Sequence, residues 1–207
     1  MPKAKFAKAQ VSSAKAGSTT ATKADSPMVT EAYGGATSLG EDTLSTVKIL
    51  SSLKDKGPVT FARGEVTATA YGSSENGGTY ATTQTGANVS DADLVLSRTK
   101  VATGGGTTSG SEWSFETSTT RYFAIDIEGF TPRRGQITIE SRSSETVSSA
   151  PVAAQGNAAT FSVDSTATGA NSLVQVESSA LATDGFSDAT VVVTSAAETP
   201  HNDFLLV

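Results

Sequence analysis

The chain has 207 residues, a formal net charge of −6, no cysteine, and only 17% charged and 6% aromatic residues. This length suits one sizeable β domain or two small ones. The lack of cysteine excludes disulfides, thiolate metal sites and thiol nucleophiles, so stability has to come from packing and hydrogen bonds.

Residues 1–37 are predicted to form an extended basic arm. Five lysines and one aspartate within residues 1–30 give a local charge of +4, which leaves −10 of the total −6 for residues 31–207. The arm has almost no large apolar side chain, so it cannot bury enough surface to offset the entropy of ordering. We expect a partner to order it. The expected contact residues are Lys3, Lys5, Lys8, Lys15 and Lys23.

The lysines of the arm favour an acidic protein surface over nucleic acid as that partner. Five spaced lysines without arginine or interleaved aromatic residues neutralise few phosphates, and the acidic body repels a duplex. An inert tail is the remaining alternative.

Residues 38–57 are predicted to lead into the body as a short helix over Ser38–Lys56. Ser38 is a suitable N-cap, acidic residues follow in the first turn, and a Gly-Pro pair follows the last residue. A short strand at Thr46–Leu50 is the alternative. Apolar residues recur at every third position, at Leu44, Val47, Leu50 and Leu53.

From residue 58 to residue 207 the pattern predicts a β body, a sandwich or barrel of short antiparallel strands. The body is either one domain or two small modules that divide near residues 143–158. Strands are predicted at Val59–Tyr71, Thr79–Thr85, Leu94–Val101, Trp113–Glu116, Arg121–Glu128, Gln136–Arg142, Ala159–Asp164, Leu173–Glu177, Thr190–Thr194 and Asp203–Val207.

The clearest predicted hairpin pairs Arg121–Glu128 with Gln136–Arg142. In the first of these strands Phe123, Ile125 and Ile127 alternate with polar or smaller residues, and isoleucines answer in the second strand. We expect this pair to nucleate the core with its isoleucines inward and its carboxylates toward solvent.

Two further segments are predicted to contact partners. Arg133 and Arg134 lie in the turn of that hairpin, where they can meet an acidic neighbour. The segment Asp203–Val207 is apolar, and Phe204 and Leu205 are its expected contact residues. Such a strand is an aggregation hazard in water, so it has to close the chain's own sheet or add to a neighbour's edge.

No catalytic residue is predicted. His201 is the only histidine, and no Gly-x-Ser-x-Gly motif accompanies it. Asp126, Glu128 and Glu140 lie on the strands of the predicted hairpin, where a glycosidase would need two carboxylates facing each other across a cleft. Alternation places the first two on an ordinary solvent face, so a hydrolase is the least favoured class.

No cofactor or metal site is predicted either. The acidic stretches Asp91–Asp93 and Asp184–Asp188 do not match a calcium loop with a terminal glutamate. The glycines of Gly104–Gly106 do not open onto a helix with a Lys-Ser/Thr pair, so we interpret them as a flexible loop tip.

The chain combines three features: a lysine- and alanine-rich arm, a Ser/Thr-rich β body and an apolar closing strand. In these features it resembles virion structural proteins of tailed bacteriophages, and head decoration or cement proteins most of all. The resemblance implies a non-enzymatic capsid subunit that binds capsid or tail proteins and copies of itself, with a homo-oligomer expected. It carries no specific motif, so no functional residue is transferred.

Two alternatives remain open at this stage. A tail-tube or tail-associated subunit is similar in the same features. A carbohydrate-binding or adhesin module is the second, with Trp113 and Tyr122 as sugar-stacking candidates, although both suit a core. Neither terminus shows a secretory signal or a membrane span, so the expected location is the virion, after synthesis in the host cytoplasm.

Overall fold

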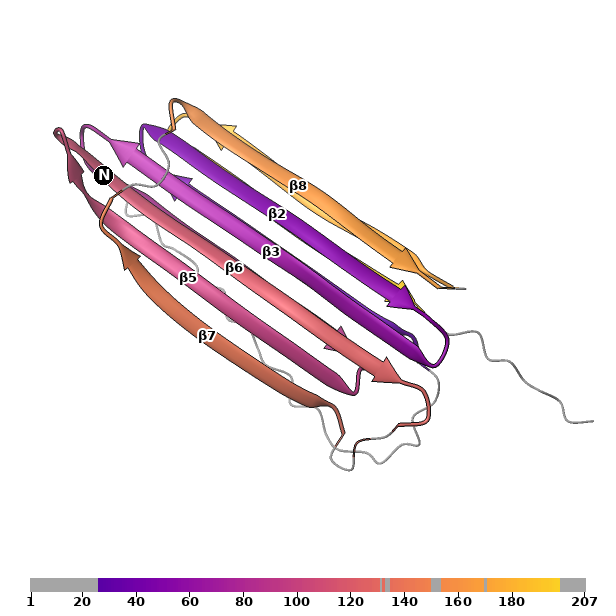
Figure 1. The fold of residues 1–207 in the computed structure, drawn as a ribbon. Coiled ribbons are helices and arrows are strands. Elements are labelled where there is room, and N and C mark those ends of the chain that lie inside the picture. The colour runs from indigo at the N-terminus through magenta and orange to yellow at the C-terminus, as the bar shows by residue number, and fades with distance from the viewer. Residues whose placement is uncertain (1–25, 131, 133–134, 150–153, 170, 198–207) are drawn as a thin grey trace, which may run out of the picture.

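The computed structural model describes residues 26–130, 132, 135–149, 154–169 and 171–197 (Figure 1). Within these ranges the chain forms ten strands and no helix. The strands are β1 (Met28–Leu39), β2 (Asp42–Asp55), β3 (Val59–Ser74), β4 (Tyr80–Ser90), β5 (Leu94–Thr108), β6 (Ser111–Ile127), β7 (Ile137–Val147), β8 (Asn157–Thr168), β9 (Leu173–Thr183) and β10 (Phe186–Ala197).

The strands form two sheets packed face to face. The four-stranded sheet has the order β4-β1-β10-β9. The six-stranded sheet has the order β7-β5-β6-β3-β2-β8 (Figure 1). Every neighbouring pair is antiparallel except β2–β8 and β5–β7, which are parallel. Because β10 pairs with β1 and β8 pairs with β2, the segment after residue 157 completes the same two sheets as the segment before residue 143.

The predicted β class is confirmed, and the sheets form an open sandwich instead of a closed barrel. The strands are not short, however, because each has between 11 and 17 residues. The predicted strands Trp113–Glu116 and Arg121–Glu128 fall in the single strand β6, which ends one residue earlier, at Ile127. Hydroxyl and β-branched residues continue the strand through the serine and threonine stretches that the prediction treated as breaks.

The helix predicted over Ser38–Lys56 is wrong, because these residues form the end of β1, a turn and strand β2. Side chains of β2 alternate between buried and less buried positions. Val47 and Leu53 of the expected apolar stripe face the core, whereas Leu50 points to the opposite face and is 37% exposed. Five serines and threonines in β2 favour the extended chain, since they weaken a helix and suit a pleated surface.

The extended arm predicted over residues 1–37 ends earlier than expected. Residues 28–37 belong to β1, which is flanked by β4 and β10 inside the four-stranded sheet. Strand β1 alternates buried and half-buried side chains along its whole length, but its inward residues are mostly alanine, glycine, serine and threonine. Small inward residues hid the strand from a search for large apolar ones. Residues 1–25 lie outside the described ranges.

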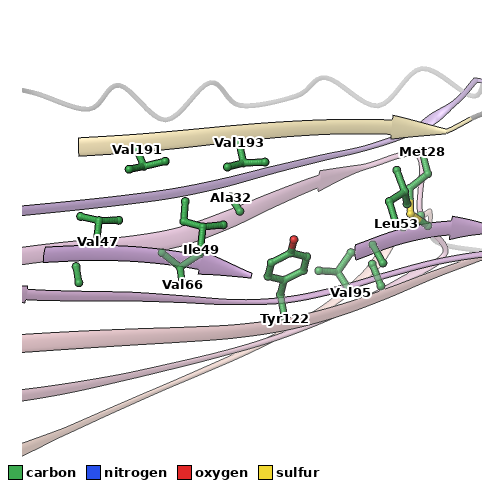
Figure 2. Packing of buried hydrophobic residues seen from close by; sticks show 14 of the residues in the cluster. Met28, Ala32, Val47, Ile49, Leu53, Val66, Val95, Tyr122, Val191 and Val193 are labelled. Atoms are coloured by element: carbon green, nitrogen blue, oxygen red, sulfur yellow. The ribbon is translucent and has the colours of Figure 1, made fainter. Parts of the chain in front are cut away.

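The core between the sheets is built from small side chains. Figure 2 shows the larger ones, with Met28, Leu53 and Val95 gathered at one end. Alanines fill much of the remainder, at Ala32, Ala36, Ala62, Ala68, Ala70, Ala124 and Ala189. A core of this kind contains few large side chains, and Tyr122 is the only aromatic one among its buried residues.

Buried hydroxyl groups in this core bond to one another. The Oγ atoms of Ser38 and Ser187 lie 2.8 Å apart, and those of Ser38 and Ser45 lie 3.0 Å apart. Ser45 also donates to the main-chain oxygen of Ser187 at 2.9 Å. These contacts join β1, β2 and β10, and they allow serine to occupy fully buried positions without leaving its hydroxyl unpaired.

Candidate interaction surface

The outer face of the six-stranded sheet carries a contiguous group of large apolar side chains where β6 ends and β5 and β7 begin. In the register of the sheet Leu96 lies opposite both Phe123 and Ile139, and Leu94 lies opposite both Ile125 and Ile137. Leu96 is 38% exposed and Ile139 is 57% exposed. We call this group the apolar patch. It consists of Phe61, Leu94, Leu96, Phe123, Ile125, Ile127, Ile137 and Ile139.

The apolar patch corrects the hairpin predicted from the sequence. Strand β6 pairs with β3 and β5, and β7 pairs in parallel with β5 at the edge of the sheet. Phe123, Ile125 and Ile127 face outward, whereas Tyr122 and Ala124 face the core. Burial of Tyr122 and Ala124 between the sheets gives β6 the orientation opposite to the predicted one, with its isoleucines outward.

At the other end of the same outer face, the chain covers its apolar residues itself. Tyr71, Trp113 and Phe115 are buried in a second cluster with Leu44 and Ala154. Ala154 comes from the connection between β7 and β8. One end of this face is therefore closed by the chain, and the other end is open among the described residues.

The glycines of Gly104–Gly106 belong to this closed end. They are part of β5, not the flexible loop tip that the sequence suggested, and they pair with residues 113–115 of β6. A Cβ atom at Gly104 would lie 3.1 Å from the ring of Trp113. The same Cβ would lie 2.7 Å from the main-chain oxygen of Val147, so glycine is needed here because the backbone of β7 and the indole leave no space for a side chain.

Arginine side chains border the apolar patch. Arg63 lies opposite Phe123, and Arg98 lies opposite Arg121 in the next row of the face. The Nε atom of Arg121 donates to Oε2 of Glu65 at 2.7 Å, and both side chains are open to solvent. We call Arg63, Arg98 and Arg121 the cationic rim. Like charges directly opposite each other on a sheet are destabilising, which favours an acidic group beside Arg98 and Arg121.

The positive charges of the described fold are concentrated on this face. Of its eight lysines and arginines, six lie on the outer face of the six-stranded sheet, while Lys56 is in the β2–β3 turn and Arg142 is on the inner face of β7. The Nζ atom of Lys56 lies 5.6 Å from the ring centre of Phe61, at the margin of the apolar patch. The charges make this face suitable for an acidic partner although the chain as a whole is acidic.

Tyr122 fixes which face of β6 points outward. It is buried, and its hydroxyl lies 2.7 Å from the hydroxyl of Ser51 on β2. Figure 2 shows this hydroxyl directed into the space between the sheets. Since residues alternate along a strand, anchoring Tyr122 inward places Arg121 and Phe123 on the outer face.

The replacement Tyr122→Phe is expected to change how stability depends on pH. Burial raises the pKa of the Tyr122 hydroxyl, and the hydrogen bond to Ser51 opposes this shift. The folded state therefore favours the neutral phenol, while the unfolded chain ionises near pH 10. This contribution to stability is present below pH 10 and is lost as the pH rises from there through the folded pKa.

In wild-type protein the free energy of unfolding should therefore decline above pH 10. Tyr122→Phe should weaken that decline and cost about 1 kcal/mol at pH 7 through the unpaired Ser51 hydroxyl. Urea titrations at pH 7, 10 and 11 measure both effects. Tyr80→Phe is the matched control because Tyr80 is half exposed and should change neither value. An unchanged alkaline decline in Tyr122→Phe would contradict this assignment.

The nine contact residues predicted from the sequence lie outside the described ranges. They are Lys3, Lys5, Lys8, Lys15, Lys23, Arg133, Arg134, Phe204 and Leu205. His201 and the predicted strand Asp203–Val207 lie outside them as well. The apolar patch was therefore not among the predicted sites. The sequence feature that could have revealed it is the excess of large residues on one side of β6.

The carboxylates considered for catalysis are not brought together as a facing pair. Strand β5 separates Asp126 on β6 from Glu140 on β7, and Glu128 follows the end of β6. The buried carboxylate of Asp93 accepts a hydrogen bond from the backbone N–H of Ile127 at 2.8 Å. The buried positions of Trp113 and Tyr122 remove both as sugar-stacking platforms.

Two other features are absent from the described residues. These residues contain no group of three or more histidine, cysteine, aspartate or glutamate side chains placed to hold a metal ion. A helix long and apolar enough to cross a membrane is also absent from the part of the chain that the structure describes.

No protein-family model, curated protein or solved structure matches this chain.

Proposed function

We propose that this chain is a non-enzymatic structural subunit of a virion, a capsid decoration or cement protein that attaches through the outer face of its six-stranded sheet. The apolar patch is the observation that carries the proposal. Soluble monomers rarely expose a contiguous apolar area of this kind, and such areas usually serve protein interfaces. A tail-tube or tail-associated subunit is the nearest alternative and would use the same face.

The two ends of the face support an assembly role. The chain buries Trp113 and Phe115 with its own β7–β8 connection but leaves Leu96, Phe123 and Ile139 accessible. Among the described residues, β7 is the edge strand of the sheet beside these side chains. A partner that covers the open end would bury apolar surface and pair with that edge at the same time.

The arm and the many copies of a subunit in a symmetric shell also support an assembly role. Residues 1–30 carry the lysine-rich sequence, which can attach to acidic neighbouring subunits without a core of its own. Each contact of this kind is weak, but a symmetric shell presents many equivalent sites to each arm and face. Attachment would therefore depend on both the apolar patch and the arm.

Particles purified from the virus that encodes this chain test the proposal. Mass spectrometry should find the chain in many copies, and electron cryo-microscopy should place it at symmetric positions on the shell or the tail. Leu96→Glu should reduce its incorporation at least tenfold, whereas Ser162→Glu, on an exposed site of the same face away from the apolar patch, should not. Absence of the chain from purified particles would overturn the proposal.

A further inference from the structure

We infer that the apolar patch binds the C-terminal segment Asp203–Val207 of a second copy of this chain. The inference deepens the proposed function and rests on it, because it names one partner for the same surface. Four consecutive apolar residues follow the acidic residue in this segment, which gives it the sequence Asp-Phe-Leu-Leu-Val. The surface offers the complementary arrangement of apolar side chains beside arginines.

The charges fit this occupant. Arg98 and Arg121 lie opposite each other on β5 and β6, next to Leu96 and Phe123 along the same strands. Glu65 occupies only Nε of Arg121, and Arg98 has no ion pair among the described residues. Asp203 precedes the extended Phe204–Val207 segment, so its carboxylate can turn toward the two arginines while Phe204 covers the neighbouring apolar residues. An acidic and apolar segment therefore satisfies both parts of the surface.

The spacing also fits. Residues two apart on an extended segment lie about 6.6–6.8 Å from each other, which is the spacing of Leu94 and Leu96 along β5. Alternate residues of an extended Phe204–Val207 segment can therefore contact successive rows of the apolar patch. The same match applies to Ile137 and Ile139 on β7.

The length of the intervening chain favours exchange between two copies. Ala197 is paired with Met28 on the four-stranded sheet, and seven residues from there to Phe204 extend about 23 Å at most. Within one molecule this segment has to pass the sheet separation of about 10 Å and go around the end of the six-stranded sheet. It also has to move sideways, because β10 packs over β2 and β8, whereas the apolar patch lies on β3, β6, β5 and β7. The sheet separation and a sideways step from β2 to β6 of about 10 Å together use most of this length, whereas a segment from a second copy has no such constraint.

Sedimentation velocity on the full chain, over a wide range of concentrations, measures the expected association. Wild type should form dimers or larger species as concentration rises. The double variant Phe204→Asp/Leu206→Asp should weaken association at least tenfold, and Leu96→Glu should do the same. Thr199→Asp is the matched tail control and Ser162→Glu the matched surface control, and both should associate like wild type.

Mixing the two defective variants tests exchange directly. The tail variant keeps an intact apolar patch and the Leu96→Glu variant keeps an intact tail, so together they should form a heterodimer that neither forms alone. A synthetic peptide of residues 198–207 should bind the tail variant and not Leu96→Glu, as measured by fluorescence anisotropy. The tail variant lies beyond all ten strands, so it remains informative if Leu96→Glu fails to fold.

Three outcomes would overturn the inference. These are a monomeric wild type at high concentration, association that the tail variant does not change, and hydrogen-exchange protection of the apolar patch in a monomer that is lost in the tail variant. The last result would assign the tail to its own molecule. If the chain is found in particles but its copies do not exchange tails, only this inference is wrong. If the copies exchange tails but the chain is absent from particles, only the proposed function is wrong.

Discussion

Replacement of Ile49 by alanine should lower the free energy of unfolding by about 2–5 kcal/mol, the usual cost of emptying a fully buried aliphatic site. Ile49 lies in the middle of β2, is 0% exposed, and pairs with Val66 on one side and Val163 on the other. Its side chain is directed between the two sheets (Figure 2). The small residues around it cannot reorganise to fill a cavity, so we expect the upper half of that range. Urea denaturation followed by circular dichroism measures the change.

Leu50→Ala provides the matched control, because the two residues are adjacent aliphatic residues on opposite faces of β2. Leu50 is on the outer face and 37% exposed, so its loss should cost less than about 1 kcal/mol. A helix with the stripe Leu44, Val47, Leu50 and Leu53 would give the opposite order, with Leu50 as the more costly position. A larger loss at Leu50 than at Ile49 would therefore contradict strand β2.

The error in this region has an identifiable physical origin. An apolar residue at every third position fits a helix. The same sequence also fits a strand, with buried residues at alternate positions, once serine and threonine are counted among the buried residues. Strand β2 buries Thr43, Ser45 and Ser51 because neighbouring groups accept or donate hydrogen bonds to them, as Tyr122 does for Ser51. Those partners are far away in the sequence, so local periodicity could not reveal them.

Strand positions were predicted better than strand neighbours. Segments such as Val59–Tyr71 and Leu94–Val101 fall within β3 and β5, because β-branched runs bounded by glycine and asparagine carry a local signal. Order in the sheet depends on where the connection after β6 goes. That connection crosses β5 and places β7 on its far side. The turn of a true hairpin can have a similar length, so the length of the connection does not distinguish the two arrangements.

The apolar patch was missed because alternation alone does not say which face of a strand is buried. In β6 the large residues Phe123 and Ile125 alternate with Tyr122 and Ala124, and a one-residue change of orientation exchanges the two faces. The decisive information is the size of the inward residues on the other strands. Repeated alanines at alternate positions of β3, such as Ala68 and Ala70, indicate a core built mostly from small side chains.

The substitution Gly64→Ala should cost about 3 kcal/mol or more, because the new methyl group has no space on either side. Gly64 lies on β3 between Ser51 and Tyr122 in the register of the sheet. A Cβ atom there would be 2.6 Å from both the main-chain oxygen of Leu50 and Cζ of the Tyr122 ring. The ring cannot easily move away, since its hydroxyl is held by Ser51. Thermal and urea unfolding should both show the loss.

The matched control is Gly35→Ala on β1, a strand glycine with open space around it. The nearest atom to a Cβ at Gly35 is Oγ1 of Thr190, at 4.0 Å. Alanine there should be neutral or stabilise by up to about 1 kcal/mol, because it reduces the freedom of the unfolded chain. In a Tyr122→Ala background the penalty of Gly64→Ala should shrink, since one of its two clashes is removed. Equal effects at Gly35 and Gly64 would mean that β3 and β6 are not paired in this register. The structural reason for the outward direction of Phe123 would then be lost.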